Sequence, residues 1–267
     1  MGLVACEFDG SGVAFNDGGA TADIDGATPE TDGMAAVDAA VIDATSVAGN
    51  ALLFDGTDDL VGATRQIAGD FTIEVWLRTT DTITGSQHYH GLSIVHADRG
   101  GNHNDFGTAI LNGHFAFGTG NPDVTIESST EVTTGDWVHL AATREQSTGI
   151  IRLYVNGDEE AALSTGNSND LTATDTLTLG ANPVDGRFFR GMMDEVRIWN
   201  TARSGAEILA NKNTRLVGTE SGLVNYWRFD EGSGMTTADA TGSNDGSLGN
   251  GSAAASPNWF ASGAPVF

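Results

Sequence analysis

Cysteine, lysine and long apolar runs are almost missing from this chain of 267 residues. Cys6 is the only cysteine, so no disulfide bond can form within the chain, which suits a cytosolic protein or a secreted domain held by its core or by calcium. No stretch approaches the roughly 18 apolar residues of a membrane-spanning helix. Residues 1–20 show no basic head, apolar stretch or small-residue cleavage site, so we expect a mature protein or an excised domain.

Basic residues are also scarce. The chain has 12 of them against 36 acidic residues, and only Lys212 is a lysine, so the formal net charge is −24. Phosphate contacts need clustered lysine and arginine, and nucleic acid is therefore a poor partner. An anionic membrane surface is disfavoured for the same reason. The acid excess favours either solubility in saline surroundings or a calcium-rich setting.

Alternation of apolar and polar residues is the strongest structural pattern that is present. In residues 71–78, apolar side chains alternate with polar ones such as Thr72 and Glu74, as in a half-buried strand. Asn-Gly and Asp-Gly pairs, which favour tight hairpins, separate similar segments. This pattern predicts an all-β antiparallel sandwich or jelly roll, in a single domain of residues 1–267. The other predicted strands are residues 92–96, 109–117, 137–144, 150–155, 176–179, 192–199 and 223–229.

One short helix is predicted near residues 204–212. Ser204 can cap its first turn, and Glu207, three residues later, completes the capping-box pattern. The apolar residues Ile208 and Leu209 follow. We expect this helix to lie at the edge of the sandwich.

An internal repeat links the two ends of the chain. Residues 3–12 match residues 223–234 with a two-residue difference in length, and each copy passes from a strand into an acidic, glycine-rich loop. The repeat is too short for two domains, so we expect both strands in related positions of one sandwich. Residues 11–50 and 232–256 have few large apolar groups and are predicted to be long surface loops.

Five motifs occur in an order that is typical of one family. They are residues 51–56 (Ala-Leu-Leu-Phe-Asp-Gly), 71–76 (Phe-Thr-Ile-Glu-Val-Trp), 137–141 (Trp-Val-His-Leu-Ala), 152–157 (Arg-Leu-Tyr-Val-Asn-Gly) and 191–199 (Gly-Met-Met-Asp-Glu-Val-Arg-Ile-Trp). With the tail at residues 226–259, they resemble the laminin G-like jelly-roll domains of the concanavalin A-like lectin and glucanase fold. The resemblance implies a jelly roll of two curved antiparallel sheets, frequent calcium binding and a role in carbohydrate binding or adhesion, but no particular ligand.

Aspartates at strand ends are the candidate calcium ligands, because calcium takes six to eight oxygen ligands, several of them carboxylates. Asp55 precedes a glycine at a strand end. Asp194 lies in an otherwise apolar strand, where a carboxylate is costly unless it is paired or bound to a cation, and the resemblance implies a structural calcium ligand at this position. Asp9 and Asp230, the matching acids of the repeat, complete the predicted set. A salt bridge from Asp194 to an arginine is the alternative.

A polar, glycine-hinged loop at residues 96–105 is the predicted ligand site. Five of the six histidines fall within residues 88–114. Directional polar groups on a rigid scaffold suit the hydroxyl groups of a saccharide. A solvated loop, or a transition-metal site from His96, His103 and Asp98, is the alternative. The predicted ligand-binding residues are Asp98, Arg99, Asn102, His103, Asn104 and Asp105.

A second place for a ligand follows the Asp-Gly turn at residues 185–186. Arg187, Phe188 and Arg190 are placed to line a concave rim there, whereas the resemblance implies that Phe189 packs inward. We expect ligand binding at this place if the histidine-rich loop does not bind.

Catalytic patterns are weak. Glucanases of the resembled fold carry three acids at alternate positions of one strand, and the nearest segment here has Ser129 between Glu127 and Glu131. Glycoside hydrolysis needs two positioned carboxyl groups, one of them protonated, and no apolar pocket is evident around this segment. Cys6 has no evident histidine partner, and no nucleophile elbow, phosphate-binding loop or zinc-protease motif occurs. We therefore predict that the protein is not an enzyme.

The predicted function is a non-catalytic, calcium-binding carbohydrate-binding or adhesion module of a larger extracellular or cell-surface protein. Its expected partners are a glycan or cell-surface polysaccharide and the other domains of that protein, with neither nucleic acid binding nor membrane insertion. Two alternatives stay open, a glycoside-active enzyme on the same fold and a structural spacer in a repetitive surface protein. Two acids that face each other across a groove would favour the enzyme.

Overall fold

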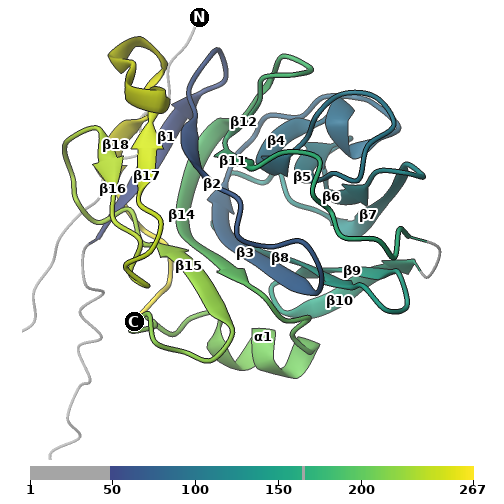
Figure 1. The fold of residues 1–267 in the computed structure, drawn as a ribbon. Helices are drawn as coiled ribbons and strands as arrows, with labels where there is room; N and C mark the ends of the chain where they lie inside the picture. Colours follow the sequence, from purple (N-terminus) through teal and green to yellow (C-terminus); the bar gives the residue numbers. More distant parts are fainter. Residues whose placement is uncertain (1–48, 164–165) are drawn as a thin grey trace, which may run out of the picture. The chain divides into compact units, whose positions relative to one another are not determined.

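Two large antiparallel sheets and one α-helix make up residues 49–163 and 166–267, which the computed structural model describes (Figure 1). The sheets pack face to face, so the predicted all-β jelly-roll sandwich of two curved sheets with one short helix is confirmed. Asp9 and the first copy of the repeat lie outside the described residues. That residues 1–267 form a single domain stays a prediction.

Sheet A contains eight strands, which are β1 (Asn50–Asp55), β3 (Phe71–Arg78), β8 (Val138–Glu145), β9 (Ile150–Val155), β10 (Asp158–Leu163), β14 (Arg190–Trp199), β15 (Leu223–Trp227) and β18 (Asn258–Ala261). Their order is β10-β9-β8-β3-β14-β1-β18, and β15 also pairs with β14. The ten-residue strand β14 therefore has three neighbours, because β1 pairs with its first half and β15 with its second.

Sheet B also contains eight strands, which are β2 (Val61–Thr64), β4 (Leu92–Ala97), β5 (Phe106–Leu111), β6 (His114–Thr119), β7 (Val124–Glu131), β11 (Thr176–Leu179), β16 (Thr236–Thr237) and β17 (Gly246–Leu248). Their order is β16-β17-β2-β11-β4-β5-β6-β7. A small hairpin of β12 (Ala181–Asn182) and β13 (Arg187–Phe188) stands beside them, and the short 3₁₀ helices are η1 (His88–His90), η2 (Gly249–Gly251) and η3 (Ala253–Ala255).

Two connections differ from the predicted pattern. Residues 109–117 are not one strand but parts of β5 and β6, which the tight turn at Asn112 and Gly113 joins with positive φ angles of 55° and 89°. Residues 232–256 are not merely a surface loop, because they contribute β16 and β17 to sheet B and bury Leu248 completely. Both differences arise from pairing with neighbouring strands, which alternation along one segment does not show.

The core lies between the two sheets and is rich in phenylalanine. Phe71 of β3 contacts Phe106 of β5 and Phe117 of β6, with ring centroids 4.9 and 6.0 Å apart. Phe189 is fully buried and packs edge-on against Phe54, so its predicted inward orientation is confirmed. Burying each such side chain stabilises the fold by roughly 1.5–3 kcal/mol.

The outer face of β3 is buried as well, so the prediction of a half-buried strand is wrong. Only Arg78 of this strand is exposed. Residues 200–214, which follow β14 and which we call the covering segment, cover the other outward side chains. Thr72 donates to the carbonyl of Thr201 at 2.7 Å, and Trp76 Nε1 donates to the carbonyl of Lys212 at 2.8 Å. Sheet A is therefore sandwiched between the core and this covering segment.

The helix α1 (Gly205–Asn211) begins where the sequence predicts it. Ser204 accepts a hydrogen bond from the backbone N–H of Glu207, and the Glu207 carboxylate accepts one from that of Ser204, which completes the capping box. Ile208 packs against Ala141 and Tyr154, so the helix lies on the outer face of sheet A over β8 and β9. Among the described residues, no helix combines the length and apolar character that a bilayer span requires.

Candidate functional site

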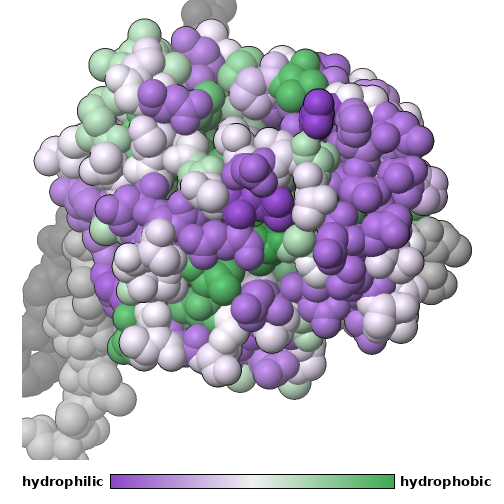
Figure 2. All heavy atoms as spheres, viewed as in Figure 1, coloured by the Kyte–Doolittle hydropathy of each residue, from purple (hydrophilic) through white to green (hydrophobic). Residues whose placement is uncertain are grey.

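Four aspartates from three separate loops converge at one end of sheet B. The connection between β4 and β5 contributes Asp98 and Asp105, that between β6 and β7 contributes Asp123, and the turn between β12 and β13 contributes Asp185. Together with Tyr89 of η1 they line a pocket of about 150 Å³, which we call the acid pocket. Polar side chains dominate the surface over β5–β7 in the view of Figure 1 (Figure 2).

Asp98 lies at the centre of the acid pocket. Its carboxylate accepts hydrogen bonds from the side-chain amide of Asn182 at 2.7 Å and from the backbone N–H of Gly100 at 3.0 Å. The same Asn182 amide donates to Asp185 at 3.0 Å. The carboxyl groups of Asp105 and Asp185 are near enough to Asp98 to affect its pKa, although the three do not all lie within 4.8 Å of one another.

Asp105 is the buried member of the acid pocket, with 4% of its surface exposed. Gly120 makes room for it, since a Cβ atom at that position would stand 2.2 Å from Asp105 Oδ1. Burial and then the charge of Asp98 raise the pKa of Asp105 to about 7. Burial alone would also raise the pKa of Asp98, but the hydrogen bond from Asn182, the nearby His96 and the neighbouring carboxyl groups together outweigh it, and that pKa is lowered. Near neutral pH the two carboxyl groups therefore share a proton, or a cation takes its place.

Two of the six predicted ligand residues, Asp98 and Asp105, line the acid pocket. Arg99 and Asn102 are exposed on the same loop, and His103 is half-buried. None of these three lines the pocket, although the two glycines between Arg99 and Asn102 do. The structure thus separates the predicted set into pocket residues and outer loop residues.

Asn104, the sixth predicted ligand residue, points between loops. Its Oδ1 accepts hydrogen bonds from the side-chain amides of Asn121 at 2.9 Å and Asn167 at 2.8 Å. Its backbone carbonyl accepts another from Ala173 at 3.0 Å. These contacts make Asn104 a support for the loops around the acid pocket.

Two buried histidines account for much of the histidine-rich segment. His88 and His96 are each 1% exposed, and their ring centroids lie 5.8 Å apart. The rings lie against Gly118 and Gly107, paired residues of β6 and β5 whose missing side chains leave a trough in the sheet. Burial lowers the pKa of His96 to about 4, so the ring is neutral at neutral pH. In the part of the chain that the structure describes, neither ring belongs to a close group of three metal-ligating side chains, and the transition-metal alternative gains no support.

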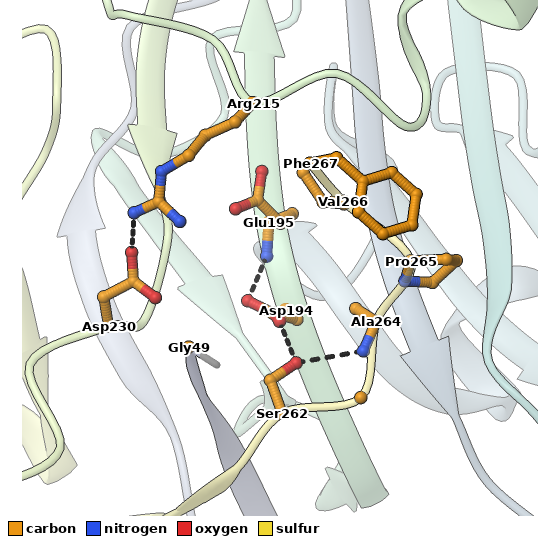
Figure 3. A pocket seen from close by; sticks show the side chains of 11 residues that line it. Gly49, Asp194, Glu195, Arg215, Asp230, Ser262, Ala264, Pro265, Val266 and Phe267 are labelled. Atoms are coloured by element: carbon orange, nitrogen blue, oxygen red, sulfur yellow. Dashed lines mark hydrogen bonds and ion pairs between the residues drawn. The ribbon is translucent and has the colours of Figure 1, made fainter. Parts of the chain in front are cut away.

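Asp194 and Asp230, two of the predicted calcium ligands, line a second pocket of about 210 Å³ (Figure 3). Asp194 is 5% exposed and accepts hydrogen bonds from the N–H of Glu195 at 2.8 Å and from the hydroxyl group of Ser262. Burial raises the pKa of Asp194 to about 8. Arg215, the arginine of this pocket, pairs with Asp230 rather than with Asp194. The pocket therefore contains one acid with a raised pKa, Asp194, beside Glu195 and the Arg215–Asp230 ion pair.

Asp55, the third described calcium candidate, lies apart from this pocket at the end of β1. Its carboxylate and those of Asp58 and Asp59 lie within 4.8 Å of one another, which is the one such group in residues 49–163 and 166–267. Asp55 accepts a hydrogen bond from Thr57 N–H at 2.7 Å, and Asp59 accepts one from Asp55 N–H at 2.8 Å. These acids therefore also shape the turn after β1.

The acids of β7 do not face each other as a catalytic pair would. Glu127 accepts a hydrogen bond from the side-chain amide of Asn112, and Glu131 accepts one from the hydroxyl group of Thr133, each at 3.0 Å. An irregularity in the pairing of β7 with β6 falls between the two glutamates, so they do not alternate regularly along one face. The residue between them, Ser129, donates its backbone N–H to Glu160 of β10.

Three residues of the acid pocket, Tyr89, Asp123 and Asp185, are not among the predicted ligand residues. In the sequence, Asp185 is evident only as part of an Asp-Gly turn, and Asp123 resembles any other loop acid. The usable signal is that each aspartate stands in a connection beside a strand end, where functional groups often gather. Which connections meet depends on the strand order of the sheet.

Comparisons with known proteins agree with this architecture. A solved structure of a putative carbohydrate binding protein from Bacteroides ovatus is similar at a TM-score of 0.64 and 19% identity, over 82% of this chain and 62% of that one. A pentraxin from Limulus polyphemus is similar at a TM-score of 0.51 and 12% identity, over 77% of this chain and 97% of that one. At these identities the likeness concerns the fold. Pappalysin-1 of Mus musculus is 32% identical over an alignment of 162 residues, which covers 54% of this chain and 10% of that protein.

A family model matches more than half of the chain. It covers residues 54–209, from the end of β1 into α1, and its description is the concanavalin A-like lectin/glucanases superfamily. All five motifs of the predicted resemblance fall within this range or overlap it. The chain belongs to the laminin G-like family of the concanavalin A-like lectin/glucanase superfamily.

Proposed function

We propose that this domain binds carbohydrate at the acid pocket and its surrounding loops, that calcium in the pocket takes part, and that no catalysis occurs. The observation that carries the proposal is the convergence of Asp98, Asp105, Asp123 and Asp185 around about 150 Å³, with no basic side chain in the lining. This volume is below the roughly 300–1,000 Å³ of small-molecule pockets and suits an ion better than a sugar ring. The fold likeness to a putative carbohydrate binding protein supports the sugar.

The acid pocket offers calcium the oxygen ligands that it prefers, but no three of its carboxylates lie within 4.8 Å of one another, so binding would draw them together. Calcium takes six to eight oxygen ligands, and the four aspartates offer two oxygens each. The buried carboxylate of Asp105 faces the carboxylate of Asp98 instead of a base, and a cation there would compensate both charges. Asn182 holds Asp98 and Asp185 in place by donating to both. A bound calcium ion would supply open coordination positions for sugar hydroxyl groups.

The geometry of Asp98 and Asp105 argues against hydrolysis. Their pKa values diverge, as those of an acid and a base in an enzyme do. The two carboxyl groups of glycosidases, however, stand about 5–5.5 Å or about 6.5–9.5 Å apart, so that a glycosidic bond or a water molecule fits between them. Asp98 and Asp105 instead act on each other's pKa as a hydrogen-bonded pair, which is the arrangement of two acids that share a proton.

A larger extracellular or cell-surface protein is the proposed setting. The chain spans about a tenth of the length of pappalysin-1, so the matching segment is one part of that protein. A net charge of −24 suits saline or calcium-rich surroundings and disfavours nucleic acid. These observations support a module that works beside other domains.

The test is a glycan-array screen in millimolar calcium and again in excess chelator. We expect at least one glycan to bind in calcium and to be released by the chelator. Asp105→Asn should abolish this binding, whereas Asp158→Asn, which removes the same charge from an exposed site on β10, should preserve it. Absence of any glycan binding in calcium would contradict the proposal and favour the structural spacer. If glycan binding persisted both in chelator and in Asp105→Asn, calcium would have no part in the proposed function.

Calcium at the earlier predicted ligands is a separate proposal. Asp194 and Asp230 share one pocket, and Asp55 joins Asp58 and Asp59 at another place, so these acids can make at most two further sites. Calorimetric titration of the wild type, Asp194→Asn and Asp58→Asn would count the ions. Each true site should lose one bound ion in its own variant, and an unchanged count would exclude that site.

A further inference from the structure

A groove of about 620 Å³ opens on the outer face of sheet A, at the end of β3. Its floor follows one row of paired residues across the sheet, in which Asn258, Leu53, Met192 and Arg78 are successive partners on β18, β1, β14 and β3. The covering segment that buries Thr72 and Trp76 does not contribute to its lining. We call this cavity the arginine groove.

Two exposed arginines lie in the arginine groove. Of the 12 basic residues, only Arg78, Arg99 and Arg190 are exposed, and the first and third line the groove. Arg78 Nε donates to the carbonyl of Gly135 at 2.6 Å, which fixes the side chain and leaves its terminal nitrogens free for a ligand. Arg190 Nη1 stands 3.9 Å from Asp81, a loose pair that a ligand can replace. In a chain with so few bases, two exposed guanidinium groups in one cavity favour the binding of a polar ligand there.

The lining of the arginine groove has mixed charge. Asp55 and Asp81 oppose the two arginines, and Leu53 and Met192 form an apolar floor between them. An anionic sugar would face the two acids, and a cationic one would face the arginines. A neutral sugar suits both charges, because its hydroxyl groups accept hydrogen bonds from the guanidinium groups and donate them to the carboxylates. The C–H face of its ring can then pack on the apolar floor.

The β12–β13 hairpin and the residues directly after it link the linings of the arginine groove and the acid pocket along the chain. Asp185, in the turn of this hairpin, lines the acid pocket, and Arg190, five residues later, lines the groove. The two cavities also differ in size, and each size suits a different part of a calcium-dependent glycan site. About 150 Å³ suits an ion, whereas about 620 Å³ is typical of a cavity for a small organic ligand.

We propose that the arginine groove is a second saccharide subsite, which takes neutral sugar residues of a glycan whose other end is held at the acid pocket. The inference rests on the proposed function. It assigns to Arg78 and Arg190 hydrogen bonds to sugar hydroxyl groups, and to Leu53 and Met192 contact with the ring. Affinity should therefore rise with chain length, because only a longer oligosaccharide reaches both cavities.

The experiment measures affinity in calcium for linear gluco-, xylo- and arabino-oligosaccharides of two to six sugars, with oligogalacturonates as the anionic series. We expect the wild type to gain about tenfold or more between the shortest and longest neutral chains, as two charge-assisted hydrogen bonds would give. The double variant Arg78→Gln/Arg190→Gln should lose this gain and keep its affinity for disaccharides. Arg152→Gln, in a groove of about 610 Å³ at the other end of β3, is the matched control and should keep the gain.

Each result decides for or against the subsite. A length-dependent gain that survives in the double variant overturns it while leaving the proposed function intact. A gain confined to oligogalacturonates overturns the assignment to neutral sugars. Lack of binding at every length overturns the proposed function together with the subsite. If the double variant melts lower than the wild type, Arg190→Lys, which keeps the charge but not the planar fork, replaces it and should lose part of the gain.

Discussion

Two buried carboxylates, Glu74 on the outer face of sheet A and Asp105 in the acid pocket, have similar burial and opposite surroundings. Glu74 is 0% exposed, accepts a hydrogen bond from Arg203 at 2.7 Å and lies 3.2 Å from His139 Nε2. Burial alone would raise the pKa of Glu74, but His139 and the nearby arginines lower it to about 2. Asp105 is 4% exposed and faces Asp98, so its pKa rises to about 7.

The neighbours of each acid explain the difference. Near Glu74, Arg197 donates to Glu195 at 3.1 Å and to the carbonyls of Asn211 and Thr214, so this cluster fastens the covering segment to the sheet. Its charges compensate one another within the protein. The lining of the acid pocket offers no base, and compensation has to come from a proton or a cation. Buried acids with bases hold the fold together, whereas buried acids without them indicate a binding site.

Removing Glu74 should have the largest effect on stability. Glu74→Ala leaves Arg203 without its buried counter-charge, whereas Arg197 keeps Glu195, and breaking such a buried pair costs about 3–5 kcal/mol. Urea unfolding measures this loss. The control is Glu159→Ala, whose partner Arg152 lies 3.6 Å away in a partly exposed pair worth under about 1 kcal/mol. Equal losses in the two variants would contradict a structural role for the Glu74 cluster.

Acid should weaken the same cluster. The folded state lowers the pKa of Glu74 from 4.5 to about 2, so its contribution is complete above about pH 4.5 and is lost as the pH falls towards 2. Burial lowers the pKa of His139 below 6.5, so the folded state favours its neutral form. The free energy of unfolding therefore also begins to decrease as the pH falls below about 6.5. The urea midpoint, measured between pH 3 and 8, should therefore decrease as the pH is lowered. Glu74→Gln should flatten the part below pH 4.5, and an unchanged slope would refute the assignment.

Much of the fold is predictable from the sequence, because its signals are local. The alternation in residues 150–155 marks β9 to the residue, and Ser204 and Glu207 mark the start of α1. The burial of the outer face of β3 is not predictable in this way. Glu74 is a polar position by pattern, and its partner Arg203 lies 129 residues further along the chain.

The candidate site is predictable only in part for the same reason. Asp98 and Asp105 share one polar loop, which the sequence shows, but Asp123 and Asp185 come from other connections. Their meeting depends on the order of β4, β5 and β6 and on the β12–β13 hairpin. Asp194 and Asp230, predicted together as calcium ligands from a resemblance and a repeat, do share a pocket. Calcium binding there stays a prediction.

Calcium should stabilise the protein through the acid pocket by a smaller amount than the loss of Glu74 removes. A ligand that binds only the folded state adds about 2.7 kcal/mol at 100 times its dissociation constant. Asp105→Asn should abolish its share of this gain, and in chelator the variant should be at least as stable as the wild type, because one buried like charge is gone. Thermal melting with and without calcium tests this, with Asp158→Asn as the control. If calcium stabilised the Asp105 variant as much as the wild type, the stabilising ion would have to bind at Asp194 or at Asp55 instead.

The smallest effects should separate Asn102 from Asn104, two residues apart in the same loop. Asn104 accepts amide hydrogen bonds from Asn121 and Asn167, so Asn104→Ala should lower the free energy of unfolding by about 1 kcal/mol, roughly the value of one buried hydrogen bond. Asn102 is exposed, and Asn102→Ala should change stability by less than about 0.5 kcal/mol. Asn104→Ala should also weaken calcium binding, because Asn104 supports the loop that carries Asp98 and Asp105. Urea unfolding and calcium titration of both variants decide the point. If Asn102→Ala proved the more damaging change to stability, the loop would not be held as the structure shows.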